Sequence, residues 1–327
     1  MYQVIGIDVS KAKLDCLWFK DPETKKVKSK VWPNSPDGFT NVIAWAEKNT
    51  GCVISDIHFV MEATGVYHEA LAYALHDAGA RVSIVNPARM RDFAKSLGVV
   101  TKTDKKDSSV LARMGLSLAL DDWKPEPKNI RILKALLGRL DALELDISRE
   151  KNRLEKAEVA QVPETVIESI QTLLRTLESE RERLIQEIND HIDSDPGLKK
   201  DRELLETIPA IGPVLSRTLL AILRSRPFSK ASQCAAYLGV IPCQWESGSS
   251  IKGRSKLSKK GPSRVRAKLY MPAVVATRSN PDIKQQYDRL IKNGKPKMVA
   301  IGAAMRKLVQ ICFGVLKHQS EYRPQQA

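Results

Sequence analysis

The fold is decided near the start of the chain, at Tyr2-Gln3-Val4-Ile5-Gly6-Ile7-Asp8, an apolar run that ends in a carboxylate. A second apolar run, Ile57-His58-Phe59-Val60-Met61-Glu62, ends in the same way. Short apolar runs bounded by polar or turn residues are typical of buried strands. Both runs are therefore expected to be strands, with Asp8 and Glu62 carried at their ends.

Further strands and helices are expected to alternate over the first ~115 residues. Strand-like runs cover residues 13–19 and 81–85, and Lys26–Trp32 is expected to pair as another strand. Apolar residues recur at helical spacing over residues 37–48, 66–78 and 105–120. At Asn86-Pro87 the strand 81–85 is expected to end in a turn. Consecutive strands followed by β-α-β units predict an α/β domain with a mixed sheet and covering helices.

Two more carboxylates, Asp104 and Asp107, are three residues apart, a spacing that puts both on one face of a helix. Carboxylates at strand ends and on one helix face can converge, but two unit charges about 4 Å apart repel by roughly 4 kcal/mol at an effective dielectric of ~20. A cluster of Asp8, Glu62, Asp104 and Asp107 therefore implies a divalent cation. Mg²⁺ is the expected ion and Mn²⁺ the alternative, since both prefer oxygen ligands.

The rest of the chain is expected to be mainly helical. Asp121–Pro127 contains two prolines and mixed charge, which marks a linker. Beyond it, apolar stripes from Leu133 to Leu154 and from Val166 through Leu173 to Ile188 are typical of an antiparallel hairpin or coiled coil, or equally of an ordinary helical bundle. The predicted domains are residues 1–122 (α/β), 123–197 (helical hairpin) and 198–327 (mainly α).

The charge is concentrated at one end of the chain. The 327 residues carry a net charge of +15, and Ser250–Ala327 alone, with 18 Lys+Arg and 3 Asp+Glu, accounts for all of it. A basic region attached to a neutral body is typical of nucleic-acid binding. The alternatives are a solvated surface or an acidic protein partner.

Hydropathy and cysteine usage predict a cytoplasmic protein. No apolar run approaches the ~18 residues that a membrane-spanning helix needs, and the N-terminal run does not resemble a signal peptide. The five cysteines include no CxxC pair. This pattern fits a reducing compartment and argues against a zinc ribbon or a disulfide framework.

A turn at Thr207-Ile208-Pro209-Ala210-Ile211-Gly212-Pro213 precedes an apolar helix, Val214–Leu223. It is close to a helix-hairpin-helix turn, whose backbone N–H groups contact a DNA phosphate. The usual motif has glycine at the position of Ala210, and Pro213 removes one donor. A plain interhelical turn is the alternative.

A serine-rich segment, Trp245–Arg254, leads into a basic stretch. Its serines could belong to a phosphate-binding loop, or one of them could be a nucleophile for phosphoryl transfer, which requires a nearby positive field. The residues alone do not choose among Ser247, Ser249 and Ser250. The cations that could supply the field, or bind nucleic acid directly, are Arg254, Lys259, Lys260, Arg264, Arg266 and Lys268.

Taken together, these motifs resemble the DEDD-type insertion-sequence transposases, also called bridge recombinases, to which pilin-gene invertases are related. The resemblance covers essentially the whole chain, because the motifs occur jointly, in order and at matching spacings. They are Gly6–Lys11, Met61–Gly65, Asn86-Pro87, Lys102–Asp107, Ile208–Gly212, Ala235–Gly239, Glu246–Ser250 and Lys268–Pro272.

The resemblance implies a RuvC-like, ribonuclease-H-type N-terminal domain whose four acidic residues bind Mg²⁺. It also implies a helical transposase domain whose catalytic serine, by its position in the motif, is Ser247. Such recombinases use an RNA, encoded beside their gene, whose loops pair with donor and target DNA, so that base pairing selects the sequence. Family members form dimers and tetramers. Ala210 departs from the family's commoner Pro-Gly-Ile-Gly turn.

Three other functions compete with this one. A RuvC-like or RNase-H-like nuclease would use the carboxylates to activate water and would form no covalent intermediate. An ATPase of the actin and sugar-kinase type has a first phosphate loop similar to Gly6–Lys11, but a second Asp-x-Gly loop is not found at a suitable place. A non-catalytic nucleic-acid-binding protein would use the helical hairpin to multimerise.

Overall fold

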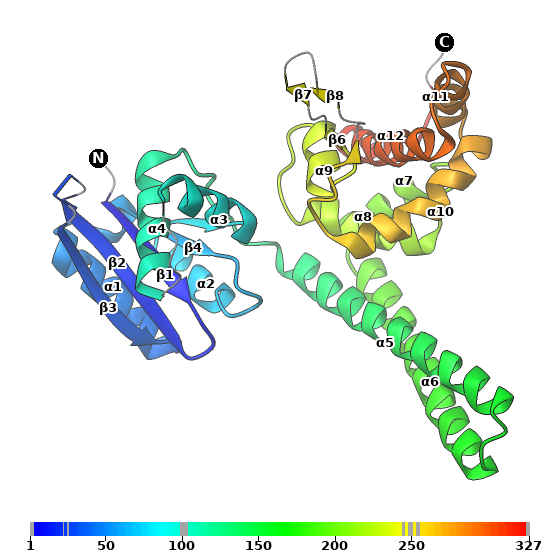
Figure 1. Cartoon of the computed structure of the whole chain (residues 1–327), viewed down its shortest axis with the longest axis horizontal. Helices are drawn as coiled ribbons and strands as arrows, with labels where there is room; N and C mark the ends of the chain where they lie inside the picture. The colour runs from blue at the N-terminus through cyan, green and yellow to red at the C-terminus, as the bar shows by residue number, and fades with distance from the viewer. Residues whose placement is uncertain are drawn as a thin grey trace. The chain divides into compact units, whose positions relative to one another are not determined.

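The computed structural model describes residues 3–21, 23–24, 26–98, 104–243, 246–247, 251–252 and 256–324. Within these ranges, only the backbone is described for six residues: 104, 105, 246, 247, 251 and 252. The chain forms two compact units, Met1–Pro125 and Glu126–Ala327. Figure 1 shows a mixed α/β unit at the blue end of the chain and a mostly helical unit from green to red.

The first unit is built on a five-stranded sheet of order β3-β2-β1-β4-β5. The two hairpin pairings, β1–β2 and β2–β3, are antiparallel, whereas β1–β4 and β4–β5 are parallel. The sheet is therefore mixed, as the sequence predicted. Its strands are β1 (Gln3–Val9), β2 (Lys13–Asp21), β3 (Lys26–Pro33), β4 (Ile57–Glu62) and β5 (Arg81–Val85).

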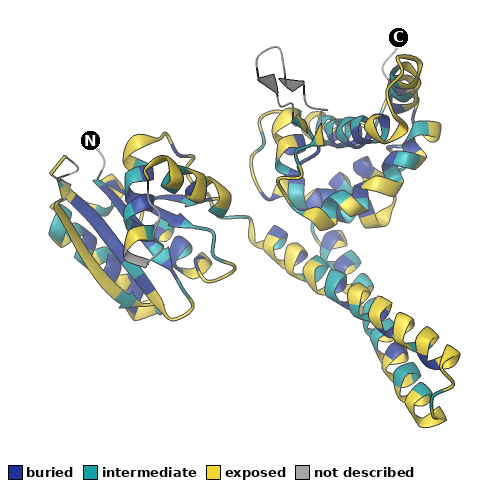
Figure 2. Ribbon diagram, viewed as in Figure 1, coloured by how far each residue is buried: buried dark blue, intermediate teal, exposed yellow. Residues whose placement is uncertain are grey.

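Helices cover both faces of this sheet. Ile5 and Ile7 of β1 belong to the core under α1 (Pro36–Thr50) and α2 (Glu69–Asp77), with the short 3-10 turn η1 (Ile54–Asp56) leading into β4. Val4 belongs to the opposite core, under α3 (Pro87–Ser96) and α4 (Asp104–Ser117). Because strand side chains alternate between faces, Gly6 and Asp8 share the α4 face with Val4. Figure 2 shows the central strands in the buried colour.

Helix α3 is a difference from the sequence prediction, which placed only a turn at Asn86-Pro87. The Asn86 side chain accepts a hydrogen bond from the Ala88 N–H, and Pro87 occupies the first helical turn. Asparagine as N-cap followed by proline is a favourable helix start, since proline's missing N–H has no helical partner at that position.

The second unit is mainly helical, as predicted for the remainder of the chain. Among its described residues, two long helices come first, and the shorter helices that follow form a core around Leu219, Leu269 and Leu308. The helices are α5 (Lys128–Val159), α6 (Glu164–Asp193), α7 (Pro196–Glu206), α8 (Pro213–Arg224), α9 (Ala231–Tyr237), α10 (Ser263–Ser279), α11 (Pro281–Lys292) and α12 (Lys297–His318).

Helices α5 and α6 pack against each other. Leu140 of α5 and Ile188 of α6 are buried between the helices and the rest of the unit. The predicted apolar stripe is wrong at Val166 and Leu173, whose exposed fractions are 44% and 45%. Next to Leu173, the buried residue is Leu174.

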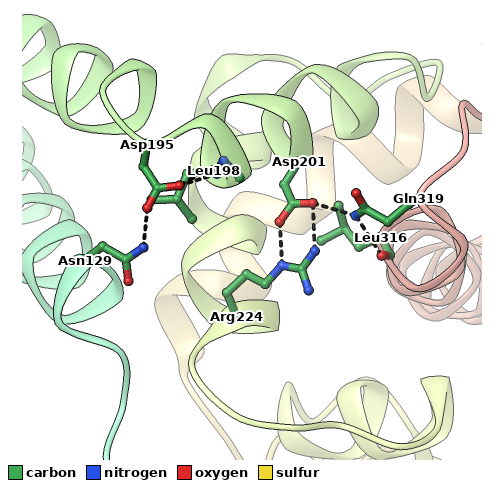
Figure 3. A network of polar contacts seen from close by, with 8 residues as sticks. Asn129, Asp195, Leu198, Asp201, Arg224, Leu316 and Gln319 are labelled. Atoms are coloured by element: carbon green, nitrogen blue, oxygen red, sulfur yellow. Dashed lines mark hydrogen bonds and ion pairs between the residues drawn. The ribbon is translucent and has the colours of Figure 1, made fainter.

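Polar contacts tie the long helices to the remainder of the second unit (Figure 3). The Asn129 amide on α5 donates to Asp195, which caps the N-terminus of α7. Asp201 of α7 is buried and accepts two hydrogen bonds, of 2.5 and 2.7 Å, from the Arg224 guanidinium and one from Gln319 after α12. This carboxylate is satisfied by fixed donors, as a buried charge requires.

Helix α12 is, among the described helices, long and apolar enough to cross a membrane by length and composition. Half of its most apolar window is buried against the protein itself. Leu308, Val309 and Cys312 are fully buried in the core of the second unit. Burial within that core therefore accounts for the high hydropathy of α12.

Candidate active site

Asp8 and Glu62 lie at the same edge of the first unit's sheet. Strands β1 and β4 are parallel neighbours with Ile7 opposite Met61, so the two carboxylates follow in adjacent positions. Both residues are partly exposed. Val60 belongs to the core under α4, and strand alternation puts Glu62 on the same face as Asp8.

Helix α4 crosses β1 at Gly6, in unusually close contact. A Cβ atom at Gly6 would lie 2.0 Å from the Ser108 carbonyl oxygen and 2.4 Å from the Ala112 nitrogen. Farther along the helix, a Cβ at Gly115 would meet Val4, at the opposite end of β1. The helix thus runs antiparallel to β1, and its N-terminal turn lies at the strand end that carries Asp8.

This crossing determines which end of β1 lies beside Asp107 and the start of α4. Asp107 immediately precedes Ser108, the residue over Gly6, and is partly exposed. Asp104 begins α4, three residues earlier, and its side chain lies outside the described residues. The backbone therefore brings the helix start to the same sheet edge as Asp8 and Glu62.

A fifth carboxylate at this edge, Asp15, was not predicted from the sequence. It lies on β2 directly opposite Asp8, and it is ion-paired with Lys13 at 3.2 Å. Its side chain is 13% exposed, and it shares the α4 face with Leu17, which packs on Ala112. Like charges directly across a strand pair are destabilising, so the Lys13 ammonium offsets repulsion at this edge. The sequence signal was the alternation of side chains along β2, which puts Asp15 on the same face of the strand as Leu17 and Phe19.

A buried histidine fastens the chain that leaves α4. His58 Nε2 lies 2.8 Å from Ser83 Oγ, and the Ser83 hydroxyl donates to the Asp121 carbonyl. Ser83 uses its proton in that bond, so His58 is the donor to Ser83. Burial, aided by the Arg81 charge, lowers the pKa of His58 to about 4 and keeps the ring neutral.

The side chains at this edge suit a hard divalent cation. Asp8, Glu62 and Asp107 all offer carboxylate oxygens, the ligand type that Mg²⁺ and Mn²⁺ prefer. Among the residues whose side chains are described, no three such ligands already form a metal cluster. The fourth predicted ligand, Asp104, has no described side chain.

Ser247 lies in the second unit, on a much smaller sheet. Strand β7 (Glu246–Ser247) pairs with β8 (Ile251–Lys252), with Ser247 opposite Ile251. The side chain of Ser247 is outside the description, and Ser249, Ser250 and Arg254 lie outside the described residues altogether. Below this hairpin, β6 (Pro242–Cys243) pairs with β9 (Lys256–Leu257).

The base of the hairpin is held by close backbone packing. The Leu257 side chain of β9 packs on Gly302 of α12. A Cβ atom added at Gly302 would lie 3.5 Å from the Leu257 Cδ1 atom, in ordinary van der Waals contact. Gly261, with φ +137°, packs against the Tyr237 carbonyl, and Gly239 packs against the Lys260 backbone. Side chains at Gly239 and Gly261 would clash with backbone atoms, so the chain between β9 and α10 is fixed against α9.

The predicted basic residues have different environments. Lys259, Lys260 and Arg264 are exposed. In contrast, Arg266 donates to the Gly261 carbonyl at 2.8 Å, and Lys268 is ion-paired with Asp141 of α5. The exposed three are available to a ligand, whereas the other two bind the protein itself.

The turn before α8 contains an unfavourable backbone conformation. Ala210 has φ +78°, in the left-handed region that favours glycine. A Cβ at Gly212 would meet nothing within 4 Å, so the space around that residue is open. Phosphate binding at this turn stays a prediction.

Two family models match the sequence. A DEDD transposase model of the IS110 type matches residues 5–159, and a model described as "Transposase IS116/IS110/IS902 family" matches residues 202–288. The chain is 32% identical to a pilin gene-inverting protein of Moraxella bovis over 323 residues, 97% of each chain. The Moraxella lacunata protein of the same name is 31% identical over the same length.

These matches define the class of protein as an enzyme that cleaves and rejoins DNA. A shorter similarity, 27% identity over 124 residues, links it to a 42 kDa protein of insertion element IS900 from Mycobacterium paratuberculosis. The chain belongs to the IS110 family of DEDD transposases.

Proposed function

We propose that this transposase is an RNA-guided DNA recombinase of an insertion sequence, which cleaves and exchanges strands through a covalent serine–DNA intermediate. The observation that carries the proposal is the convergence of Asp8, Glu62 and the start of α4 at one sheet edge, in a chain of this family.

The acidic site consists of Asp8, Glu62, Asp104 and Asp107, which would hold Mg²⁺, or Mn²⁺ in its place. When bound, the ion would polarise a phosphodiester and stabilise the charge on the departing oxygen. The close crossing at Gly6 fixes the start of α4, and with it Asp107, relative to β1. Lys13 and Asp15 keep the charge at this edge partly balanced.

The nucleophile is Ser247. Its Oγ forms a bond to the phosphorus of a DNA phosphodiester as the bond from phosphorus to the 3′ oxygen breaks. The serine proton is released, and the 3′ oxygen takes up a proton and leaves as a hydroxyl. The 5′-phosphoserine link retains the phosphodiester energy, so a 3′-hydroxyl of another strand can reverse the step and complete the exchange.

The partners are donor DNA, target DNA and an element-encoded bridge RNA, and the enzyme acts as a homodimer or homotetramer in the cytoplasm, at the nucleoid. Lys259, Lys260 and Arg264 are the exposed cations nearest in sequence to Ser247. Residues 1–122, 123–197 and 198–327 serve as catalytic, spacer and transposase domains. Exposed apolar residues on α5, Ile132 and Leu145, support assembly through the long helices.

A cell assay tests the proposal. The gene is supplied with its native element ends and flanking noncoding DNA, and the circular excised junction is amplified. Wild type should form junctions, whereas Ser247→Ala and Asp8→Ala should not. Junctions that survive Ser247→Ala would instead favour a nuclease that uses water as the nucleophile. Deletion of the flanking noncoding DNA tests the RNA separately, and undiminished junctions would exclude guidance by it.

A further inference from the structure

One face of α10 exposes apolar side chains between two arginines. Met271 and Val275, four residues apart, have exposed fractions of 60% and 48%. Arg264 and Arg278, also exposed, lie on the same helical face toward the two ends of the helix. In Figure 2 the exposed colour recurs along α10. Large apolar side chains that gather on a surface commonly mark an interaction site.

The start of α12 extends this surface. Met298 is 64% exposed and Val299 is 47% exposed. The Tyr270 hydroxyl of α10 donates to the Met298 sulfur at 3.9 Å, so the ring and the thioether are neighbours across the two helices. We call Tyr270, Met271, Val275, Met298 and Val299 the α10–α12 face.

Only positive charge borders the α10–α12 face in the elements that form it. Helix α10 contains no Asp or Glu, and neither does the segment 292–299. Lys295 and Lys297 are exposed beside Met298. Lys268 of α10 is ion-paired with Asp141 of α5. An apolar surface with a cationic border is complementary to nucleic acid.

We propose that the α10–α12 face binds unpaired nucleobases of a single-stranded nucleic acid, with Tyr270 and Met298 as the stacking platform and Arg264, Arg278, Lys295 and Lys297 as contacts for the flanking phosphates. Aromatic rings beside cations are the usual means of single-strand binding. In a duplex the base faces are stacked on one another, whereas unpaired bases leave these faces open to contact with the exposed tyrosine, methionines and valines. The inference rests on the family's action on nucleic acid and is independent of Ser247 chemistry.

Binding measurements test it. Fluorescence anisotropy is recorded with labelled single-stranded DNA, single-stranded RNA and duplex DNA in EDTA, using full-length Asp8→Asn protein so that cleavage cannot interfere. The double variant Met271→Gln/Met298→Gln should bind single strands about tenfold more weakly, with duplex binding and salt dependence unchanged. Both side chains are largely exposed, so this variant should fold.

The cationic border is tested by salt dependence. Lys295→Gln/Lys297→Gln should reduce the slope of log affinity against log salt by about two. The control for the methionine variant is Val31→Gln/Val53→Gln, which changes exposed apolar residues of the first unit and should leave binding unaltered. Equal losses in both apolar pairs would overturn the proposal.

Crosslinking identifies the occupant directly. Oligonucleotides containing iodouracil should crosslink to the peptide that contains Tyr270, and the comparison of DNA with RNA shows which strand supplies the bases. No crosslink at α10 or α12, with unchanged affinity of both surface variants, would overturn the proposal. If the Gln variants change the oligomeric state by light scattering but not single-strand affinity, a second copy of the chain covers this face and the proposal is wrong. Neither result depends on whether Ser247 is the nucleophile.

Discussion

The acidic edge of the first unit and the serine hairpin of the second are constructed in opposite ways. Asp8 and Glu62 stand on the central strands of a five-stranded sheet, each strand paired on both sides. Ser247 stands on a two-residue strand whose partner, among the described residues, is another two-residue strand. The carboxylates are therefore fixed by the core of the protein, while the serine depends on a small local structure.

The backbone shows the same contrast. In the described part of the first unit, residues with positive φ are glycines, as at Gly51 and Gly79. In the second unit, non-glycine residues also adopt this conformation, namely Gln161, Ala210, Lys259 and Gln319. Each such residue costs about 1–2 kcal/mol. Among the described residues, left-handed conformations of non-glycine residues therefore occur in the second unit and not in the unit that carries the acidic edge.

The largest expected effects separate the two centres by chemistry. Asp8→Asn should reduce strand cleavage by about three orders of magnitude or more, because it removes a carboxylate from the proposed cation site. Ser247→Ala should abolish the covalent protein–DNA adduct and leave RNA binding nearly intact. Adduct yield is measured by gel mobility after denaturation, and folding by circular dichroism.

Three outcomes would break this separation. An undiminished adduct in Ser247→Ala would mean that Ser249 or Ser250 is the nucleophile. Cleavage without any adduct in wild type would mean that water is the nucleophile. Unfolding of Asp8→Asn would make Asp8 a structural residue. Asp77→Asn is the control, because this carboxylate is 77% exposed and lies away from the sheet edge on α2; it should leave both readouts unchanged.

Gly6→Ala tests whether core packing fixes the acidic edge. The new Cβ would lie 2.0 Å from a backbone oxygen of α4, so the helix must move. We expect a loss of about 3 kcal/mol in the free energy of unfolding. Cleavage by the remaining folded protein should also fall, because Asp107 moves with the helix. Urea unfolding and single-turnover cleavage measure the two effects.

The control for this substitution is Gly138→Ala, on the exposed side of α5, where a Cβ would meet nothing within 4 Å. It should stabilise the protein by about 0.5–1 kcal/mol, as alanine does within a helix. If Gly6→Ala were as stable and as active as wild type, α4 would not pack against β1 as closely as the Gly6–Ser108 contact indicates.

The pH dependence of stability tests the fastening of α4 by His58. Its pKa is about 4 in the folded state, below the value of about 6.5 expected when unfolded. The unfolded chain therefore takes up a proton first as the pH falls. The stability that neutral His58 contributes is fully present above pH ~6.5 and is lost as the pH falls from about 6.5 to 4. The total loss in the free energy of unfolding is about 2 kcal/mol.

The matched variant is His58→Gln, which retains an N–H donor toward Ser83 but does not titrate. Between about pH 6.5 and 4, the free energy of unfolding measured in urea should fall more for wild type than for His58→Gln. Above pH ~6.5, the two proteins should show the same dependence on pH. Equal slopes over the whole range would mean that His58 is not held neutral by burial.

Much of the first unit could be predicted because strand signals are local. The apolar runs ending in Asp8 and Glu62 became adjacent parallel strands, so their convergence followed from the pattern. Helix α3 was missed because Asn86-Pro87 was interpreted as a turn, although the same pair is a favourable helix start. The role of Gly6 depends on where α4 crosses the sheet, which no local pattern contains.

The second unit was harder to predict in detail. Apolar periodicity located α5 and α6 but shifted the buried position from Leu174 to Leu173, since a helical stripe drifts over many turns. Strands of two residues, such as β7, are too short for any periodicity. The assignment of Ser247 over its neighbours came from the family resemblance alone, and it stays a prediction.

The smallest expected effect concerns the strained backbone of the second unit. Ala210→Gly relieves the left-handed conformation at φ +78° but increases the entropy of the unfolded chain. We expect a net gain of about 0.5–1 kcal/mol in the free energy of unfolding. The control is Ala135→Gly, at an exposed position within α5, which should cost a similar amount. Opposite signs in urea unfolding would confirm that the second unit stores strain where the first unit uses glycine. A loss at both positions would mean that Ala210 is not strained, and the contrast between the units would then rest on strand pairing alone.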